Sequence, residues 1–167
     1  MTVTIRPATA ADETALSRID QDTWSPYVSP AVYTGRSFFA GAAPDQVLVA
    51  EVEEQVAGYV AIRPATQLPS NAHVFWMFLA VSPSAQRRGV ASRLIGAAER
   101  FAVQRGGSKL SLRVLGVNSG ARALYEKLGY VVEGVLRGEF RLPIGPGVDE
   151  IPVDDVLMAK QLSAPTN

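Results

Sequence analysis

Residues 81–94, VSPSAQRRGVASRL, follow an apolar run and lead into an amphipathic segment. A strand that enters a helix through a short loop leaves the first N–H groups of the helix without carbonyl partners, and the helix dipole adds partial positive charge there. Gly89 lets an anion approach without a Cβ in the way, while Arg87 and Arg88 add charge from the rim. The stretch predicts an anion-binding loop; the alternative is a solvent-exposed turn with two surface arginines.

Common nucleotide-binding motifs do not fit this loop. It lacks the Gly-Lys-Ser/Thr of a P-loop and the three-glycine spacing of a dinucleotide fold. The anion is therefore not identified by either pattern.

The flanking segments predict a strand, a helix and a second strand. Residues 73–81, HVFWMFLAV, are apolar at odd and even positions, which is typical of a central strand covered on both faces. Apolar residues recur at helical spacing over 91–102, and the Gly106-Gly107 pair ends that helix. Because a helical crossover joins them, residues 73–81 and 109–114 are predicted to form a parallel pair.

The remaining chain predicts mostly antiparallel strands around this unit. A strand at 3–5 and a helix at 10–22 come first, followed by a short helix near 31–40 and a hairpin of residues 46–52 and 55–63. A further helix ending at Gly129 precedes strands at 130–142 and 153–162. We expect an α/β (α+β) sheet in one domain over residues 1–162, with a disordered tail at 163–167.

Composition narrows the function. The chain has 167 residues, and 16 basic residues balance 16 acidic ones, so no net field favours nucleic acid or an anionic membrane. There is no cysteine and a single histidine, His73, which argues against a metal site and a thiolate nucleophile. No apolar run is long enough to span a membrane, and the N-terminus does not resemble a signal peptide. We expect a cytoplasmic protein without nucleic-acid or membrane partners.

Two motifs together resemble those of the GCN5-related N-acetyltransferases. QRRGVA, residues 86–91, is similar to the family's Gln/Arg-x-x-Gly-x-Gly/Ala signature, and NSGARALYEKLGY, residues 118–130, is similar to its Asn-x-x-Ala-x-x-Leu-Tyr segment. The order of predicted elements also fits this family over nearly the whole chain. The resemblance implies a mixed, mostly antiparallel sheet of six to seven strands with one splayed parallel pair and about four flanking helices.

The resemblance also implies acetyl-CoA as co-substrate and a primary amine as acetyl acceptor. In that family the loop binds the pyrophosphate of acetyl-CoA through backbone amides. The implied cofactor-binding residues are Leu79, Val81, Gln86, Arg87, Arg88, Gly89, Val90, Ala91, Ser92, Asn118, Ala121 and Tyr125.

Acetyl transfer needs a donor at the thioester carbonyl and a proton for the departing thiolate. The resemblance implies the backbone N–H of Val81 for the first and the phenol of Tyr125 for the second. From periodicity alone Tyr125 belongs to an apolar helix stripe, and Asn118 is a helix cap. The family reading adds a contact from Asn118 to the pantetheine arm.

The base is less defined, because many relatives place a carboxylate on the strand before the loop and residues 73–81 contain none. His73 is the candidate, with a structural histidine as the alternative. Glu51 and Glu53 are fallback candidates, and an amine bound in its neutral form would need no base. Acidic residues before the last strand could attract a cationic amine or form a solvated surface cluster: Asp149, Glu150, Asp154 and Asp155.

Three hypotheses follow. The first is an enzyme that transfers acetyl directly within a ternary complex, and the second is a non-catalytic acyl-CoA sensor or interaction module. The third is an interaction domain with an exposed patch of Trp24, Tyr27, Phe38 and Phe39. The acceptor stays open between small molecules and protein amino termini. The segment VDDVLMAKQL, residues 153–162, resembles the ending of many small-molecule acetyltransferases, and this resemblance favours a small molecule. Monomer and homodimer are both compatible with the sequence.

Overall fold

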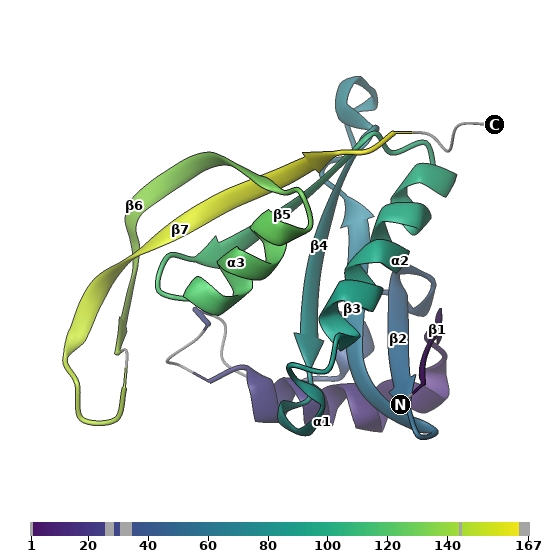
Figure 1. The fold of residues 1–167 in the computed structure, drawn as a ribbon, viewed down its shortest axis with the longest axis horizontal. Coiled ribbons are helices and arrows are strands. Elements are labelled where there is room, and N and C mark those ends of the chain that lie inside the picture. The colour runs from purple at the N-terminus through teal and green to yellow at the C-terminus, as the bar shows by residue number, and fades with distance from the viewer. Residues whose placement is uncertain (1, 26–28, 31–34, 144, 164–167) are drawn as a thin grey trace.

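The structure is a computed structural model that describes residues 2–25, 29–30, 35–143 and 145–163. Seven strands form one sheet in the order β1-β2-β3-β4-β5-β7-β6, with helices on both faces (Figure 1). Each pair of neighbours is antiparallel except β4 and β5. The strands are β1 (Val3–Pro7), β2 (Val47–Val52), β3 (Gln55–Pro64), β4 (Val74–Val81), β5 (Lys109–Leu115), β6 (Val131–Pro143) and β7 (Glu150–Gln161); the helices are α1 (Glu13–Thr23), α2 (Val90–Gln104) and α3 (Ser119–Lys127).

This architecture confirms the expected sheet with its single parallel pair. Within the described ranges there are three α-helices rather than about four. The helix expected near residues 31–40 accounts for the difference: residues 31–34 lie outside the described residues, and Phe38–Ala40 form only a short 3₁₀ turn. Most of the expected tail, residues 164–167, also lies outside the described part.

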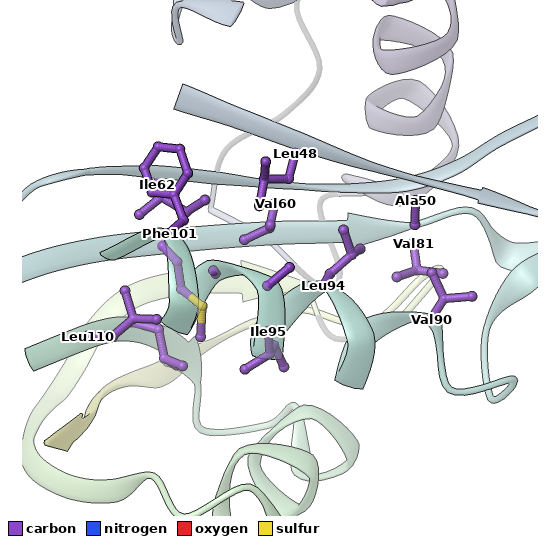
Figure 2. Close-up of a cluster of buried hydrophobic side chains, with 14 of the residues drawn as sticks. Leu48, Ala50, Val60, Ile62, Val81, Val90, Leu94, Ile95, Phe101 and Leu110 are labelled. Atoms are coloured by element: carbon purple, nitrogen blue, oxygen red, sulfur yellow. The ribbon is translucent and has the colours of Figure 1, made fainter. Parts of the chain in front are cut away.

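The two faces of the sheet carry separate apolar cores. On one face α2 lies across β2, β3 and β4, and its Leu94 points toward strand residues such as Val60, whereas Ile95 lies on the side of α2 away from these strands (Figure 2). On the other face, α1 packs Leu16 and Ile19 against the opposite side of the same strands. Burial on both faces explains why β4 is apolar at odd and even positions.

The parallel pair is short, and the two strands then diverge. Register holds only for Val74 with Lys109, Phe75 with Leu110 and Trp76 with Ser111. Beyond that point β4 stays paired with β3 to Val81, whereas β5 follows β7 to Leu115, and Figure 1 shows the two strands separating. We call the region beyond Trp76 and Ser111 the β4–β5 divergence; it leaves one side of each strand without a strand partner.

Candidate active site

The loop before α2 presents unpartnered backbone N–H groups. Arg87 has φ +61° and Gly89 has φ +80°, so two left-handed residues turn the chain into the helix. No side chain caps this N-terminus, and Arg93 is the residue whose N–H reaches back to the Gly89 carbonyl, at 3.2 Å. A Cβ added at Gly89 would meet no described atom within 4 Å. The N–H groups of Val90, Ala91 and Ser92 therefore have no carbonyl partner in the described residues and lie at the positive end of the helix dipole.

The end of β4 directs a backbone amide into the divergence. The Ser82 N–H donates to the Ala57 carbonyl at 2.8 Å, and the Ala65 N–H donates to the Val74 carbonyl at 2.9 Å. Because antiparallel bonding alternates along a strand, even-numbered residues of β4 bond to β3, and the amides of Leu79 and Val81 face the β5 side. Pairing with β5 has already ended there.

Gln86 contributes to this site through its side chain. Its Nε2 donates to the Val81 carbonyl at 3.0 Å, so the carbonyl is occupied while the N–H of Val81 faces the divergence. The sequence predicted a cofactor contact for Gln86 and gave no signal for this tether between the loop and the end of β4.

Tyr125 carries a phenol in the protonated form. It is half-buried on α3, and its ring packs edge-on against Tyr130, with centroids 6.0 Å apart. Burial raises the pKa of Tyr125 to about 12. No described residue hydrogen-bonds to its hydroxyl, so the proton is not committed to another side chain. At neutral pH this group can donate a proton but not accept one from an amine.

Asn118 begins the same helix. Its Oδ1 accepts a hydrogen bond from the Ala121 N–H at 3.2 Å, which confirms the predicted cap. The cap fixes the start of α3 and thereby the position of Tyr125 two turns later.

A polar network that the sequence did not reveal supports the far end of α3. The Tyr130 hydroxyl donates to Glu99 Oε1 at 3.1 Å, and Lys160 Nζ donates to the same oxygen at 2.9 Å. Burial and the Glu99 carboxylate raise the pKa of Tyr130 well above its ordinary value. The network ties the end of α3 to α2 and β7.

The candidate bases lie away from this site. His73 is exposed just before β4, and eight residues of extended strand place it about 26 Å from Val81. Arg6 binds Glu51 at 2.7 Å, and Glu53 lies in the β2–β3 turn. The structure does not bring any of the three together with Val81 and Tyr125.

Comparison with known proteins identifies the family. Residues 13–130 match the model of the acetyltransferase (GNAT) family. The chain belongs to this family. Its members take acetyl-CoA as co-substrate, in agreement with the expectation from the two motifs.

Relatives of this GNAT chain are similar over different lengths. It is 33% identical over 85 residues to YhfO of Bacillus subtilis (strain 168), an uncharacterized N-acetyltransferase; the match covers 50% of this chain and only 57% of that protein. YncA from Salmonella typhimurium, solved with acetyl-CoA, superposes with a TM-score of 0.78 at 20% identity, covering 100% of this chain and 98% of that one. A ribosomal-protein-alanine N-acetyltransferase from Brucella melitensis superposes with a TM-score of 0.75 at 25% identity, covering 95% and 99%.

The acidic residues before the end of the GNAT chain are not a solvated cluster. Asp155 is 2% exposed and forms an ion pair with Arg113. Asp154 accepts hydrogen bonds from Arg137 at 2.7 Å and from the Gly138 N–H at 2.8 Å. Only Asp149 and Glu150 are exposed as expected.

The aromatic residues near the N-terminus do not form an exposed patch either. Tyr27 lies outside the described residues, whereas Trp24, Phe38 and Phe39 pack in the α1-face core. Phe38 is only 8% exposed, and its ring meets that of Tyr59 edge-on with centroids 4.7 Å apart. These three side chains therefore do not form the exposed patch that the interaction hypothesis assumed.

Neither a metal site nor a membrane span is found in the part of the chain that the structure describes. It contains no group of three or more His, Cys, Asp or Glu side chains placed to hold a metal ion. None of its helices is long and apolar enough to cross a membrane.

Proposed function

We propose that this chain transfers the acetyl group of acetyl-CoA to the primary amine of a small molecule, by direct attack in a ternary complex. The observation that carries the proposal is the uncapped start of α2 beside the Val81 amide, which faces the β4–β5 divergence. The backbone amides at residues 88–92, here called the anion cradle, suit a pyrophosphate. The unpaired N–H of Val81 suits the oxygen of a thioester carbonyl.

The loop would hold the pyrophosphate through backbone amides of Arg88, Gly89, Val90, Ala91 and Ser92. The open space at Gly89 fits this use, because an anion could approach the amides without meeting a side chain. Arg87 and Arg88 are exposed and would add charge from the rim. Leu79, Asn118, Ala121 and Tyr125 would line the rest of the pantetheine path.

Val81 and Tyr125 would carry the chemistry. The neutral amine nitrogen forms a bond to the thioester carbon while the Val81 N–H donates to the carbonyl oxygen, where negative charge develops. The C–S bond then breaks, and the Tyr125 phenol gives its proton to the departing sulfur. The proton that the amine still has to lose returns the phenolate to a phenol, so the step balances without a covalent enzyme intermediate.

Family neighbours leave the acceptor class open, since the Brucella protein is named for a ribosomal-protein alanine. We favour a small-molecule acceptor, because residues 153–162 resemble the ending of many small-molecule acetyltransferases. The cytoplasmic location, the single domain over residues 1–162 and the choice between monomer and homodimer stay predictions.

An amine panel tests the proposal. Acetyl-CoA affinity is measured by calorimetry, and the protein is then incubated with acetyl-CoA and amino acids, polyamines, aminoglycosides or amino-terminal peptides. Release of free thiol and the mass of an acetylated product are recorded, with an amine-free sample as the control for hydrolysis. Product from a small amine supports the proposal; acetyl-CoA binding without product from any amine favours the sensor hypothesis, and no binding contradicts both.

A further inference from the structure

A carboxylate on α1 is held by two aromatic donors on the face of the sheet opposite α2. Asp20 Oδ1 accepts a hydrogen bond from the Tyr59 hydroxyl at 2.5 Å and another from Trp24 Nε1 at 2.8 Å. The same Trp24 Nε1 lies 3.3 Å from the Tyr59 oxygen, which closes a triangle of polar atoms. Because both donors point at one oxygen, the orientation of the carboxylate is fixed.

The second carboxylate oxygen of Asp20 has no hydrogen-bond donor among the described residues. This atom, Oδ2, is not among the buried polar atoms that lack partners, so it is not fully buried. Within the described ranges no lysine, arginine or histidine forms an ion pair with Asp20. A half-buried negative charge thus has no cationic partner, which is costly unless a ligand supplies one.

This carboxylate lies beside the end of β4. Tyr59 pairs with Ala80, the residue before Val81, and α1 packs against both strands. Phe78, on the same face of β4, is 39% exposed although β4 is a central strand, and its ring lies 6.3 Å from that of Tyr59. An oriented carboxylate next to exposed aromatic surface is the combination that recognises an organic ammonium ion.

We propose that Asp20 binds the ammonium group of the acetyl acceptor through Oδ2, with Phe78 flanking the cation. The inference rests on the proposed function, which it extends by naming the group that selects a cationic acceptor. Tyr59 on β3 and Trp24, directly after the end of α1, are the polar side chains that face Asp20, and no described charged group contacts it. Burial raises the pKa of Asp20 and the two hydrogen bonds oppose this rise, so a bound cation would favour the ionised form.

The test compares two probes with one carbon skeleton, 2-phenylethylammonium and 2-phenylethanol. Each is titrated into the protein saturated with coenzyme A, and the indole N–H NMR signal of Trp24 reports binding. Wild type should bind the ammonium probe about 10- to 100-fold more tightly than the alcohol, since hydrogen bonds to charged groups contribute about 1.5–3 kcal/mol. This measurement records binding and needs no turnover. Its result therefore does not depend on whether the amine panel yields an acetylated product.

Two variants separate charge from structure. Asp20→Asn keeps an oxygen for Tyr59 and Trp24 but removes the charge, so the preference for the ammonium probe should disappear while coenzyme A affinity is unchanged. Asp22→Asn, two residues further on the same helix, is the matched control and should keep the preference; Asp22 forms an ion pair with Arg18 at 4.0 Å.

A wild-type measurement covers the case in which Asp20→Asn does not fold. Lowering the pH until Asp20 takes up a proton should remove the preference for the ammonium probe in wild type. Equal signal shifts from both probes at neutral pH, or none from either, would overturn the inference, as would a folded Asp20→Asn protein that keeps the preference.

Discussion

In the proposed function, Tyr125 takes part both in the packing of a helix and in a chemical step. Its ring belongs to the apolar contacts of α3, while its hydroxyl has no hydrogen-bond partner in the described residues. Tyr125→Phe should therefore keep folding and acetyl-CoA binding and lower turnover by about 10²- to 10⁴-fold, the usual contribution of a general acid. Thiol release on a verified acceptor measures the rate, and thermal unfolding verifies the fold.

Tyr130→Phe is the matched control for this experiment. It also removes a phenol proton, but one that binds Glu99, so it should cost about 1 kcal/mol of stability and leave turnover nearly unchanged. Full turnover in the Tyr125 variant would return this residue to a packing role alone.

Valine substitutions at Gly89 and Gly106 test whether the anion cradle before α2 binds acetyl-CoA. The two glycines stand at opposite ends of α2 with φ of +80° and +81°, and an added Cβ would meet no described atom within 4 Å at either. Gly89→Val and Gly106→Val should lose similar stability, about 1–3 kcal/mol each from left-handed backbone strain. Only Gly89→Val should abolish acetyl-CoA binding in calorimetry, and equal losses of affinity would show that strain, not the cradle, is responsible.

At the scale of elements, β1, β2 and the start of α1 are joined by one arginine. Arg6 binds Glu51 of β2 at 2.7 Å and Asp12 at 2.8 Å, and Asp12 also accepts from the Thr9 N–H at 2.7 Å. Hydrogen bonds from Arg6 lower the pKa of Asp12 from its usual 3.8 to about 2. The folded state therefore favours the ionised form, and the resulting stability is complete above about pH 4 and lost as the pH falls toward 2.

The unfolding free energy of wild type should decrease between pH 4 and pH 2 by up to about 2 kcal/mol through Asp12. Asp12→Asn should be less stable at neutral pH and lose this part of the decrease, as measured by urea unfolding across the pH range. Asp45→Asn, at an exposed 3₁₀ turn, is the control and should follow wild type. An unchanged pH profile in the Asp12 variant would contradict the assignment.

Elements were predictable from the sequence because their signals are local. Apolar periodicity and the Gly106-Gly107 stop place α2, and the two-sided apolar run places β4 within one residue of its observed start. His73 and Val81 stand at the two ends of β4, and because a strand is extended they lie far apart in the fold. The Asp20–Tyr59 contact joins positions 39 residues apart, and nothing local marks it.

At the scale of the whole molecule, the two strands of the divergence are each fixed by a different neighbour. β4 pairs with β3, and β5 pairs with β7. Helix α2 packs on β2, β3 and β4 and has its N-terminus near the end of β4. A ligand that joins the α2 loop, Val81 and α3 would therefore connect elements from both halves of the sheet. Its binding energy should add to the stability of the entire domain rather than of one loop.

Calorimetric unfolding measures this coupling. At a concentration 100 times its Kd, acetyl-CoA should raise the unfolding free energy by about 2.7 kcal/mol and the Tm by roughly 5–10 °C, in one cooperative transition. The same concentration should leave the Tm of Gly89→Val unchanged, because the valine side chain would fill the space through which the pyrophosphate approaches the backbone amides. A second transition that does not respond to acetyl-CoA would mean that part of the sheet unfolds independently, and the single-domain assignment over residues 1–162 would then have to be divided at the divergence.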